Sequence, residues 1–146
     1  MAKRGKSWTI EWSKGKANTT DAFYIRAMVF MVEQGFKNEY DELDAKSWHV
    51  IVYDHGDPAA TGRIYQKDGV WHAGRIAVLE NYRGKGLGRV IMENLEAKVK
   101  ELGGTSVELS AQLDKKGFYQ RCGYKPRGEV YNDEHCPHID MVKELQ

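Results

Sequence analysis

The stretch RGKGLGR, residues 83–89, places three glycines and three cations within seven residues. An apolar run precedes it and a long amphipathic pattern follows it, so it lies where a strand ends and a helix begins. Free backbone N–H groups and the positive end of the helix dipole converge at such a point, and glycines let an anion approach them. Arg83, Lys85 and Arg89 add charge-assisted hydrogen bonds. The pattern predicts a diphosphate site; the alternative is a glycine-rich connection that carries solvated cations.

The spacing of these glycines does not fit two common phosphate-binding motifs. A Walker loop requires GxxxxGK[ST] and a dinucleotide fingerprint requires GxGxxG, whereas residues 83–88 read RGKGLG. The sequence therefore does not favour a P-loop or a Rossmann dinucleotide site.

A second group of chemically active residues lies in NDEHCPH, residues 132–138, where His135, Cys136 and His138 are close together. Their spacing matches no zinc signature, and a fourth ligand would have to come from far away. We expect a loop before the last strand here, and no metal. With Cys122 the chain has two cysteines, which is too few for a secreted disulfide framework, so a reducing cytoplasm is the expected location.

Strands and helices must position these residues, and the apolar periodicity predicts both. Helical spacing predicts helices at residues 21–34, 87–102 and 112–122. Alternation and turn formers predict strands at residues 7–12, 48–54, 59–66, 70–79, 105–110, 124–131 and 138–145. Between residues 35 and 47 an acidic link is expected to be irregular or briefly helical. The fold class is therefore α/β, with a mixed, mostly antiparallel, twisted sheet of about seven strands flanked by helices, in which a meander leads into a β-helix-β unit.

Length and charge limit the possible functions. The 146 residues, 41% hydrophobic, fit a single domain that spans residues 1–146. A formal net charge of +1 gives no overall field that would attract nucleic acid or anionic lipid. No run approaches the roughly 18 apolar residues of a membrane span, and the basic N-terminus lacks the apolar region of a signal peptide. We expect an unprocessed cytoplasmic protein that binds neither nucleic acid nor membranes.

The segment RIAVLENYRGKGLGRVIMENLE, residues 75–96, resembles motif A of the GNAT superfamily of acyl-CoA-dependent N-acetyltransferases. That motif is a strand followed by [QR]-x-x-G-x-[GA] and a helix, and Arg83, Gly86 and Gly88 fill its places. LSAQLDKKGFYQRCGYKPRGE, residues 109–129, resembles motif B of the same superfamily. The predicted order of elements is also the GNAT order, so the resemblance covers nearly the whole chain. The stretches VFMVEQGFKNEYDELD, ATGRIY, LSAQ and CPHIDM are similar to the ElaA/YjcF-type branch.

The resemblance implies an enzyme that transfers an acetyl group from acetyl-CoA to a primary amine by direct attack, without a metal. The acceptor is a small-molecule or peptide amine, and a homodimer is common in the family. In this picture the turn binds the CoA pyrophosphate and the preceding strand binds pantetheine, with one N–H polarising the thioester carbonyl. The implied cofactor-binding residues are Ile76, Ala77, Val78, Arg83, Gly84, Lys85, Gly86, Leu87, Gly88, Arg89, Gln112 and Tyr119.

Tyr119 matches the tyrosine that protonates the departing thiolate in this family. An alkyl thiol has a pKa of about 8.5 and a phenol of about 10, so a phenol can donate to the thiolate without being ionised at neutral pH. The alternative is a core or interface aromatic residue. Upstream of this tyrosine, many members have Asn and Ala where this chain has Gln112 and Lys115. Gln112 still offers an amide to the cofactor, but Lys115 is neither small nor apolar and leaves the packing of this helix on the cofactor in doubt.

Direct transfer also needs a base, because an alkylamine with a pKa near 10.4 is almost wholly ammonium at pH 7. We favour Glu33, because helix one helps line the acceptor site in the superfamily and VFMVEQ belongs to the branch resemblance. The acidic run NEYDELD could instead select a cationic acceptor, and each candidate has an ordinary alternative as a solvated or hydrogen-bonding residue. The candidate bases are Glu33, Asp41, Glu42, Asp44, His49, His72 and Glu80.

Two other classes of function stay open at this point. The domain could be a non-catalytic acetyl-CoA-binding sensor or interaction module. The basic MAKRGK terminus and the turn could also form a nucleic-acid patch, although the near-zero net charge argues against it.

Overall fold

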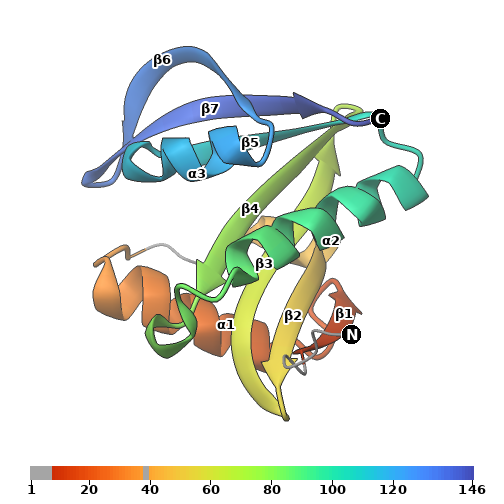
Figure 1. The fold of residues 1–146 in the computed structure, drawn as a ribbon, viewed down its shortest axis with the longest axis vertical. Coiled ribbons are helices and arrows are strands. Elements are labelled where there is room, and N and C mark those ends of the chain that lie inside the picture. Colours follow the sequence, from red (N-terminus) through yellow and green to blue (C-terminus); the bar gives the residue numbers. More distant parts are fainter. Residues whose placement is uncertain (1–7, 38–39) are drawn as a thin grey trace.

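The computed structural model describes residues 8–37 and 40–146 (Figure 1). Ser7, the basic stretch before it and residues 38–39 of the acidic link lie outside the described residues. The strands are β1 (Trp8–Lys14), β2 (Trp48–Asp54), β3 (Asp57–Lys67), β4 (Val70–Val78), β5 (Ser106–Gln112), β6 (Lys125–Asp133) and β7 (Cys136–Glu144). The longer helices are α1 (Thr20–Arg26), its π-helical continuation η1 (Ala27–Glu33), α2 (Leu87–Glu101) and α3 (Lys116–Arg121). Short 3-10 helices are η2 (Glu42–Lys46), η3 (Glu80–Tyr82) and η4 (Leu113–Lys115).

The seven strands form one mixed sheet in the order β1-β2-β3-β4-β5-β7-β6, which confirms the predicted fold class. All neighbours are antiparallel except β4 and β5, which run parallel. These two strands pair only where Trp71–Ala73 face Val107–Leu109, and from there they diverge, as Figure 1 shows. The sheet is therefore two halves joined along one short ladder.

Two elements differ from the sequence-based expectation. Residues 21–34 were expected as one α-helix, but after Arg26 the helix widens, and the Gln34 N–H reaches the Val29 carbonyl at 3.2 Å. The expected loop at residues 132–138 is instead a tight turn, because β6 runs to Asp133 and β7 starts at Cys136. Among the described residues, no helix has the length and apolar character needed to cross a membrane.

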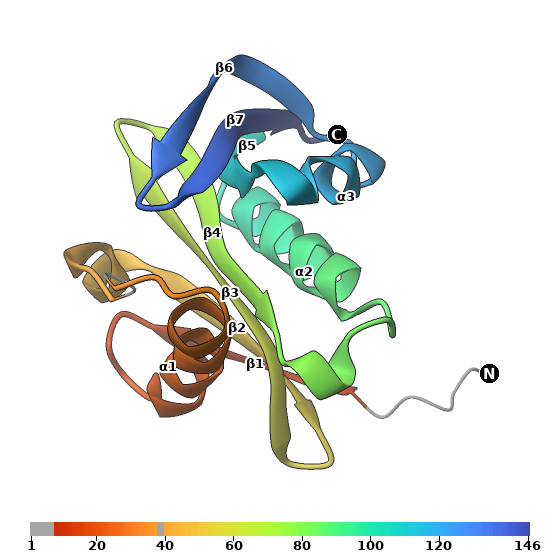
Figure 2. The same ribbon diagram turned by 90° about the vertical axis from the view of Figure 1, so that its left-hand side faces the viewer.

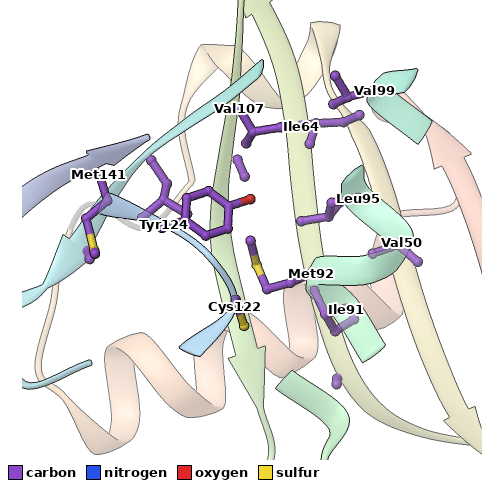
Figure 3. Packing of buried hydrophobic residues seen from close by; sticks show 14 of the residues in the cluster. Val50, Ile64, Ile91, Met92, Leu95, Val99, Val107, Cys122, Tyr124 and Met141 are labelled. Atoms are coloured by element: carbon purple, nitrogen blue, oxygen red, sulfur yellow. The ribbon is translucent and has the colours of Figure 1, made fainter. Parts of the chain in front are cut away.

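Helices cover both faces of the sheet, as Figure 2 shows, and each face has its own hydrophobic cluster. On one face, Ile91 and Leu95 of α2 pack toward Val50 and Ile64 of the sheet (Figure 3). Each fully buried aliphatic side chain of this kind contributes about 1.5–3 kcal/mol. The helix lies so close to β3 that a Cβ at Gly62 would stand 2.7 Å from Cγ2 of Ile91. Only glycine allows this approach of α2 to the sheet.

On the opposite face, α1 and η1 bury their own apolar stripe. Ile25 and Phe30 pack with Ile51 and Ala77 of the sheet in a separate cluster. The carboxyl-terminal end of η1 is thereby held beside the carboxyl-terminal half of β4.

A β-bulge in β4 allows this strand to serve both clusters. Thr61 of β3 pairs with Ala77, whereas Arg63 pairs with Gly74, so β4 contains one extra residue between the two pairs. Arg75 within this interval has φ of 53°, a left-handed conformation that is uncommon for a non-glycine residue.

The bulge reverses the inward and outward alternation of the strand. Ala73 lies in the α2 cluster and Ala77 in the α1 cluster, although residues four apart in a regular strand share one face. Past the bulge, Ile76 and Val78 face the α2 side. The bulge therefore sets which side chains and backbone groups β4 presents between the two halves of the sheet.

A buried ion-pair network connects the elements around the bulge. Asp44 of η2 accepts hydrogen bonds from Arg26 of α1, at 2.8 and 3.2 Å, and from Arg63 of β3, at 2.8 Å. The Arg26 and Asp44 side chains are each only 1% exposed. Asp41, which caps η2, accepts from Arg63 at 2.7 and 3.0 Å and from Arg75 at 3.2 Å. Because buried charges are tolerated only when they are paired, these contacts fix α1, η2, β3 and the bulge relative to one another.

Replacing Asp44 by Asn should destabilise the fold strongly. Burial alone would raise the pKa of Asp44, but the hydrogen bonds and charges of Arg26 and Arg63 outweigh it and lower the pKa to about 2. The stabilisation is thus complete above the pKa of the unfolded carboxyl, about 3.9, and is lost as the pH falls toward 2. We expect Asp44→Asn to reduce the free energy of unfolding by about 3–5 kcal/mol at pH 7, because it leaves buried guanidinium charges uncompensated.

Urea denaturation at a series of pH values measures this effect. The wild-type free energy of unfolding should fall between about pH 5 and pH 2, and the variant should show a shallower fall. Glu101→Gln is the control, because Glu101 makes only an exposed 3.4 Å pair with Lys98 and should change stability by under about 1 kcal/mol. Equal stabilities of Asp44→Asn and Glu101→Gln would contradict the structural role of the network.

Candidate active site

A cavity of about 440 Å³ lies where β4 and β5 diverge. Its walls come from both halves of the sheet, from the end of η1 and the loop after it, from α3 and from the turn between β6 and β7. The divergence of two strands that belong to one sheet creates this space, and no other element fills it in the described part of the chain.

One end of the cavity is lined by the edge of β4 beyond the bulge. Ile76, Ala77 and Val78, which the family resemblance implies as pantetheine contacts, line it. In the described structure β5 pairs with β4 no further than Ala73, so the backbone groups of this edge that point toward β5 have no strand partner. A free strand edge can form a short ladder with the amide groups of an extended ligand.

The glycine turn leads from this edge into α2. Gly86 is the residue that caps the helix, with φ of 82°, and no side chain caps the first turn. The leading N–H groups of α2 are therefore available to an anion, and the helix dipole favours negative charge there. Arg83 and Gly88 line the cavity itself.

The remaining predicted residues of the turn lie outside the cavity wall. Leu87 is buried in the α2 cluster at 1% exposure, whereas Lys85 is exposed. Arg89 donates to the Arg121 carbonyl oxygen at 3.2 Å and so connects α2 to the end of α3. Gly84 and Gly86 both have left-handed φ angles, which shape the turn.

Arg83 and Glu33 are bound to each other. The two guanidinium nitrogens Nη2 and Nη1 of Arg83 donate to the two carboxylate oxygens of Glu33, at 2.7 and 3.0 Å. The Nε of Arg83 donates to the Val78 carbonyl oxygen at 3.0 Å. Glu33 does not line the cavity, and both of its oxygens are occupied by this pair. The pair connects the end of η1 to the glycine turn across 50 residues of sequence.

Tyr119 lines the cavity from α3. Its ring packs edge-on against Phe118, at 5.0 Å between centroids, and against Tyr124, at 6.1 Å. Burial, with a smaller contribution from Cys122, raises the pKa of Tyr119 above its ordinary value, so the hydroxyl is protonated at neutral pH. Among the described residues this hydroxyl has no hydrogen-bond partner, which leaves it available to a ligand in the cavity.

The opposite end of the cavity joins the loop after η1 to the second half of the sheet. Gln112, predicted as a cofactor contact, lines the cavity and donates to the Gln34 side-chain oxygen at 2.7 Å. In the turn between β6 and β7, both carboxylate oxygens of Glu134 accept from the Lys37 N–H, at 3.0 and 3.3 Å. These contacts close the cavity across the gap between the halves.

Sequence reasoning missed several residues at this end. Phe30, Gln34, Phe36, Ser110 and His138 line the cavity but were not predicted as site residues. All five lie in stretches of the ElaA/YjcF-type resemblance, which assigns them no role; the spacing of residues 132–138 also raised His138 as a possible metal ligand. Lys115, the departure from the family pattern, also lines the cavity.

The other candidate bases lie elsewhere. Asp41 and Asp44 are held by arginines, as described above, and do not line the cavity. His49 is buried with Nε2 3.2 Å from the Asp44 carbonyl oxygen, and burial lowers its pKa. His72 stacks on Tyr65 at 5.2 Å between centroids, away from the cavity. Glu42 and Glu80 are likewise absent from the cavity wall.

In the part of the chain that the structure describes, no group of three His, Cys, Asp or Glu side chains is arranged to hold a metal ion. Burial, together with Asp114 and Asp133, raises the pKa of the Cys136 thiol, which disfavours the nucleophilic thiolate.

The fold and the site match known acyltransferases. Residues 20–145 match the family described as "Acetyltransferase (GNAT) domain". The "Uncharacterized N-acetyltransferase YjcF" of Bacillus subtilis is 37% identical over 135 residues, which cover 90% of this chain and 96% of that protein. The protein ElaA of Escherichia coli is 31% identical over 128 residues, covering 83% and 84% of the two chains.

Solved structures agree with these sequence relatives. The crystal structure of Escherichia coli ElaA has a TM-score of 0.79 at 30% identity and covers 93% of this chain and 100% of that one. An acyl-CoA N-acyltransferase from Pseudomonas aeruginosa has a TM-score of 0.84 at 30% identity, covering 94% and 99%. The chain therefore belongs to the GNAT acetyltransferase family, in its ElaA/YjcF-like branch, and is an acyltransferase that uses a CoA-linked acyl donor.

Proposed function

We propose that this enzyme transfers an acetyl group from acetyl-CoA to a primary amine by direct attack of the amine on the thioester. One observation carries the proposal: the same cavity is lined by the unpaired edge of β4 and by Tyr119, and Arg83 and Gly88 connect it to the uncapped start of α2. These are the groups that a pantetheine arm, a departing thiolate and a pyrophosphate require.

The residues present fit a CoA thioester. The free N–H groups of Gly86 to Arg89 at the start of α2 suit the pyrophosphate, with Arg83 and Lys85 beside them. The backbone of Ile76, Ala77 and Val78, apart from the Val78 carbonyl oxygen that Arg83 engages, suits the two amides of pantetheine. When bound, the thioester supplies an activated acyl carbon, and an N–H of this strand edge stabilises the negative charge that develops on the carbonyl oxygen.

Tyr119 is assigned as the general acid. The residue lines the cavity, and its hydroxyl is protonated at neutral pH and lacks another partner among the described residues. It can therefore donate its proton to the sulfur atom as the carbon–sulfur bond breaks. Because the raised pKa of Cys136 keeps this thiol protonated, direct attack is favoured over an acyl-cysteine intermediate.

Calorimetric titration with acetyl-CoA, beside dephospho-CoA and ATP, tests the cofactor site, and release of free thiol with ethanolamine, glucosamine, spermidine and lysine amide tests turnover. We expect micromolar, stoichiometric binding of acetyl-CoA and none of ATP.

Gly86→Glu should abolish binding, because it puts a negative charge and bulk against the pyrophosphate. Gly86→Ala is the matched control, since it carries the same left-handed strain at φ 82° without the charge and should weaken binding far less. Wild-type affinity in Gly86→Glu would show that the turn does not bind the diphosphate.

Tyr119→Phe should lower kcat by about 100-fold or more, because it removes the proton donor, and leave acetyl-CoA affinity nearly unchanged. The matched control is Tyr124→Phe, which removes a phenol that binds Glu96 at 2.9 Å outside the cavity. Steady-state thiol release and calorimetry on both variants separate the two effects. A large loss of affinity in Tyr119→Phe, with kcat retained, would make the residue a cofactor contact instead.

Glu33→Gln distinguishes the two roles open to this residue. If Glu33 mainly holds Arg83, the variant should free the guanidinium for the pyrophosphate and tighten acetyl-CoA binding by about two- to five-fold, with kcat retained. If Glu33 is the general base, kcat should fall by about 100-fold instead. We expect the first result, because both oxygens are engaged by Arg83 and the residue lies outside the cavity.

A further inference from the structure

His138 of β7 lines the cavity at the end opposite the glycine turn. Its residue surface is only 6% exposed, and it faces Gln112 across the β5–β7 ladder. We propose that His138 is the general base that removes a proton from the ammonium form of the acceptor. This assignment rests on the proposed function and names the base that direct attack requires.

The hydrogen bond of the ring determines which nitrogen can act. Nδ1 lies 2.9 Å from the Cys136 carbonyl oxygen. A carbonyl oxygen only accepts hydrogen bonds, so Nδ1 carries the proton and donates it. In the neutral ring Nε2 then holds the free lone pair, and no described residue occupies it. The backbone of the turn thus fixes the less common tautomer, with the basic nitrogen free.

Packing holds the ring in place on both sides. Tyr131 of β6 stacks on it, with 6.1 Å between centroids and 24° between planes, and Phe36 meets it edge-on at 6.3 Å. The Tyr131 hydroxyl is itself fixed by Asp140 at 2.7 Å and by Ser110. These contacts hold the His138 ring in one orientation, so the lone pair of Nε2 keeps one direction, as efficient proton transfer requires.

The other titratable groups at the cavity do not compete well for this role. Both oxygens of Glu134 accept from the Lys37 backbone N–H. Asp133 is exposed at the rim of the cavity, and a carboxylate is in general a far weaker base than an imidazole. Arg75, Arg83 and Lys115 are cations that line the same cavity. The two carboxylates on the β6–β7 turn instead attract an ammonium toward His138.

The step balances without a further reactant. Nε2 takes one proton from the ammonium, and the amine nitrogen then forms a bond to the acyl carbon while the carbon–sulfur bond breaks. Tyr119 gives its proton to the sulfur and regains one from the acylated nitrogen. The imidazolium releases its proton to water, so each turnover yields an amide, a free thiol and one proton.

Two variants and one control test the role of His138. His138→Asn keeps a donor near the position of Nδ1, which preserves the bond to Cys136, and deletes the basic nitrogen; His138→Gln keeps a polar but non-basic group near Nε2. We expect both to bind acetyl-CoA as the wild type does and to lose about 100-fold in kcat/KM for the amine panel at pH 7. His72→Gln, a strand histidine outside the cavity, should retain activity.

The pH dependence separates a lost base from a distorted site. For an alkylamine, the deficit of His138→Asn should shrink as the pH rises toward about 10, because solvent then deprotonates the amine. A merely structural defect would persist at every pH. A variant that matches the wild type at pH 7 would overturn the proposal while leaving the acetyltransferase assignment intact.

The tautomer can be measured without any acceptor. Long-range ring correlations in ¹⁵N-labelled protein should show a protonated Nδ1 and a bare Nε2 for His138 at pH 8. A proton on Nε2 would overturn the proposal even if turnover with the panel is slow. Failure of the wild type to bind acetyl-CoA would be a different result, because it would remove the proposed function and, with it, the need for a base.

Discussion

The rest of the structure depends on two carboxylates in one short turn, Asp41 and Asp44. They cap η2 through a reciprocal pair of hydrogen bonds and also accept three guanidinium groups that come from α1, β3 and β4. A guanidinium buried as deeply as Arg26 is stable only beside such a partner, so these contacts allow very little displacement. Because Arg75 is both a member of the network and the left-handed residue of the bulge, the network helps hold β4 in the conformation that lines the cavity.

The cavity itself follows from the interrupted pairing of the sheet. A continuous parallel ladder between β4 and β5 would satisfy the strand edge internally and leave no place for a ligand. Instead the ladder stops after Ala73, and the bulge turns the remaining part of β4 toward the space between the halves. The groups proposed to bind the donor and the proposed acid and base therefore occur at one cavity, because the two halves of the sheet both contribute to its walls.

Local patterns in the sequence were sufficient to predict most of the fold. The alternation of the strands, the three- and four-residue spacing of α2 and the glycine turn are properties of neighbouring residues, and the structure confirms the predicted order and sheet class. The widening of the helix at Ala27 was not predictable, because the seven residues of η1 are too few for apolar spacing to distinguish π- from α-helical hydrogen bonding. The hairpin turn at Glu134 was expected as a longer loop because its polar residues lack a strand signal.

The candidate site was predicted less completely, because it depends on pairs far apart in sequence. From the sequence alone Asp41 and Asp44 are plausible bases, but in the structure the arginines of α1, β3 and β4 neutralise them. Likewise, Arg83 pairs with Glu33, a residue 50 positions away in the sequence. Nothing in a linear pattern indicates which cation neutralises which carboxylate. Ile76, Ala77 and Val78 could be placed because a known motif covers them. His138 lies in the CPHIDM stretch, whose resemblance assigns it no role, and only the packing of its ring in the structure singles it out.

The short joint between β4 and β5 has a consequence for how such enzymes diversify. The half that carries α1, α2 and the glycine turn is cross-linked by its own ion pairs. The half formed by β5, β7 and β6 is joined to it by three register pairs, by the loop after η1 and by its packing and hydrogen bonds on α2. Because the β6–β7 turn forms the far wall of the cavity, we expect insertions or deletions in it to reshape that wall and to leave in place the groups proposed to bind the donor. In an enzyme of this architecture, we therefore expect changes in one exposed hairpin to alter the choice of acceptor and to leave the donor chemistry unchanged.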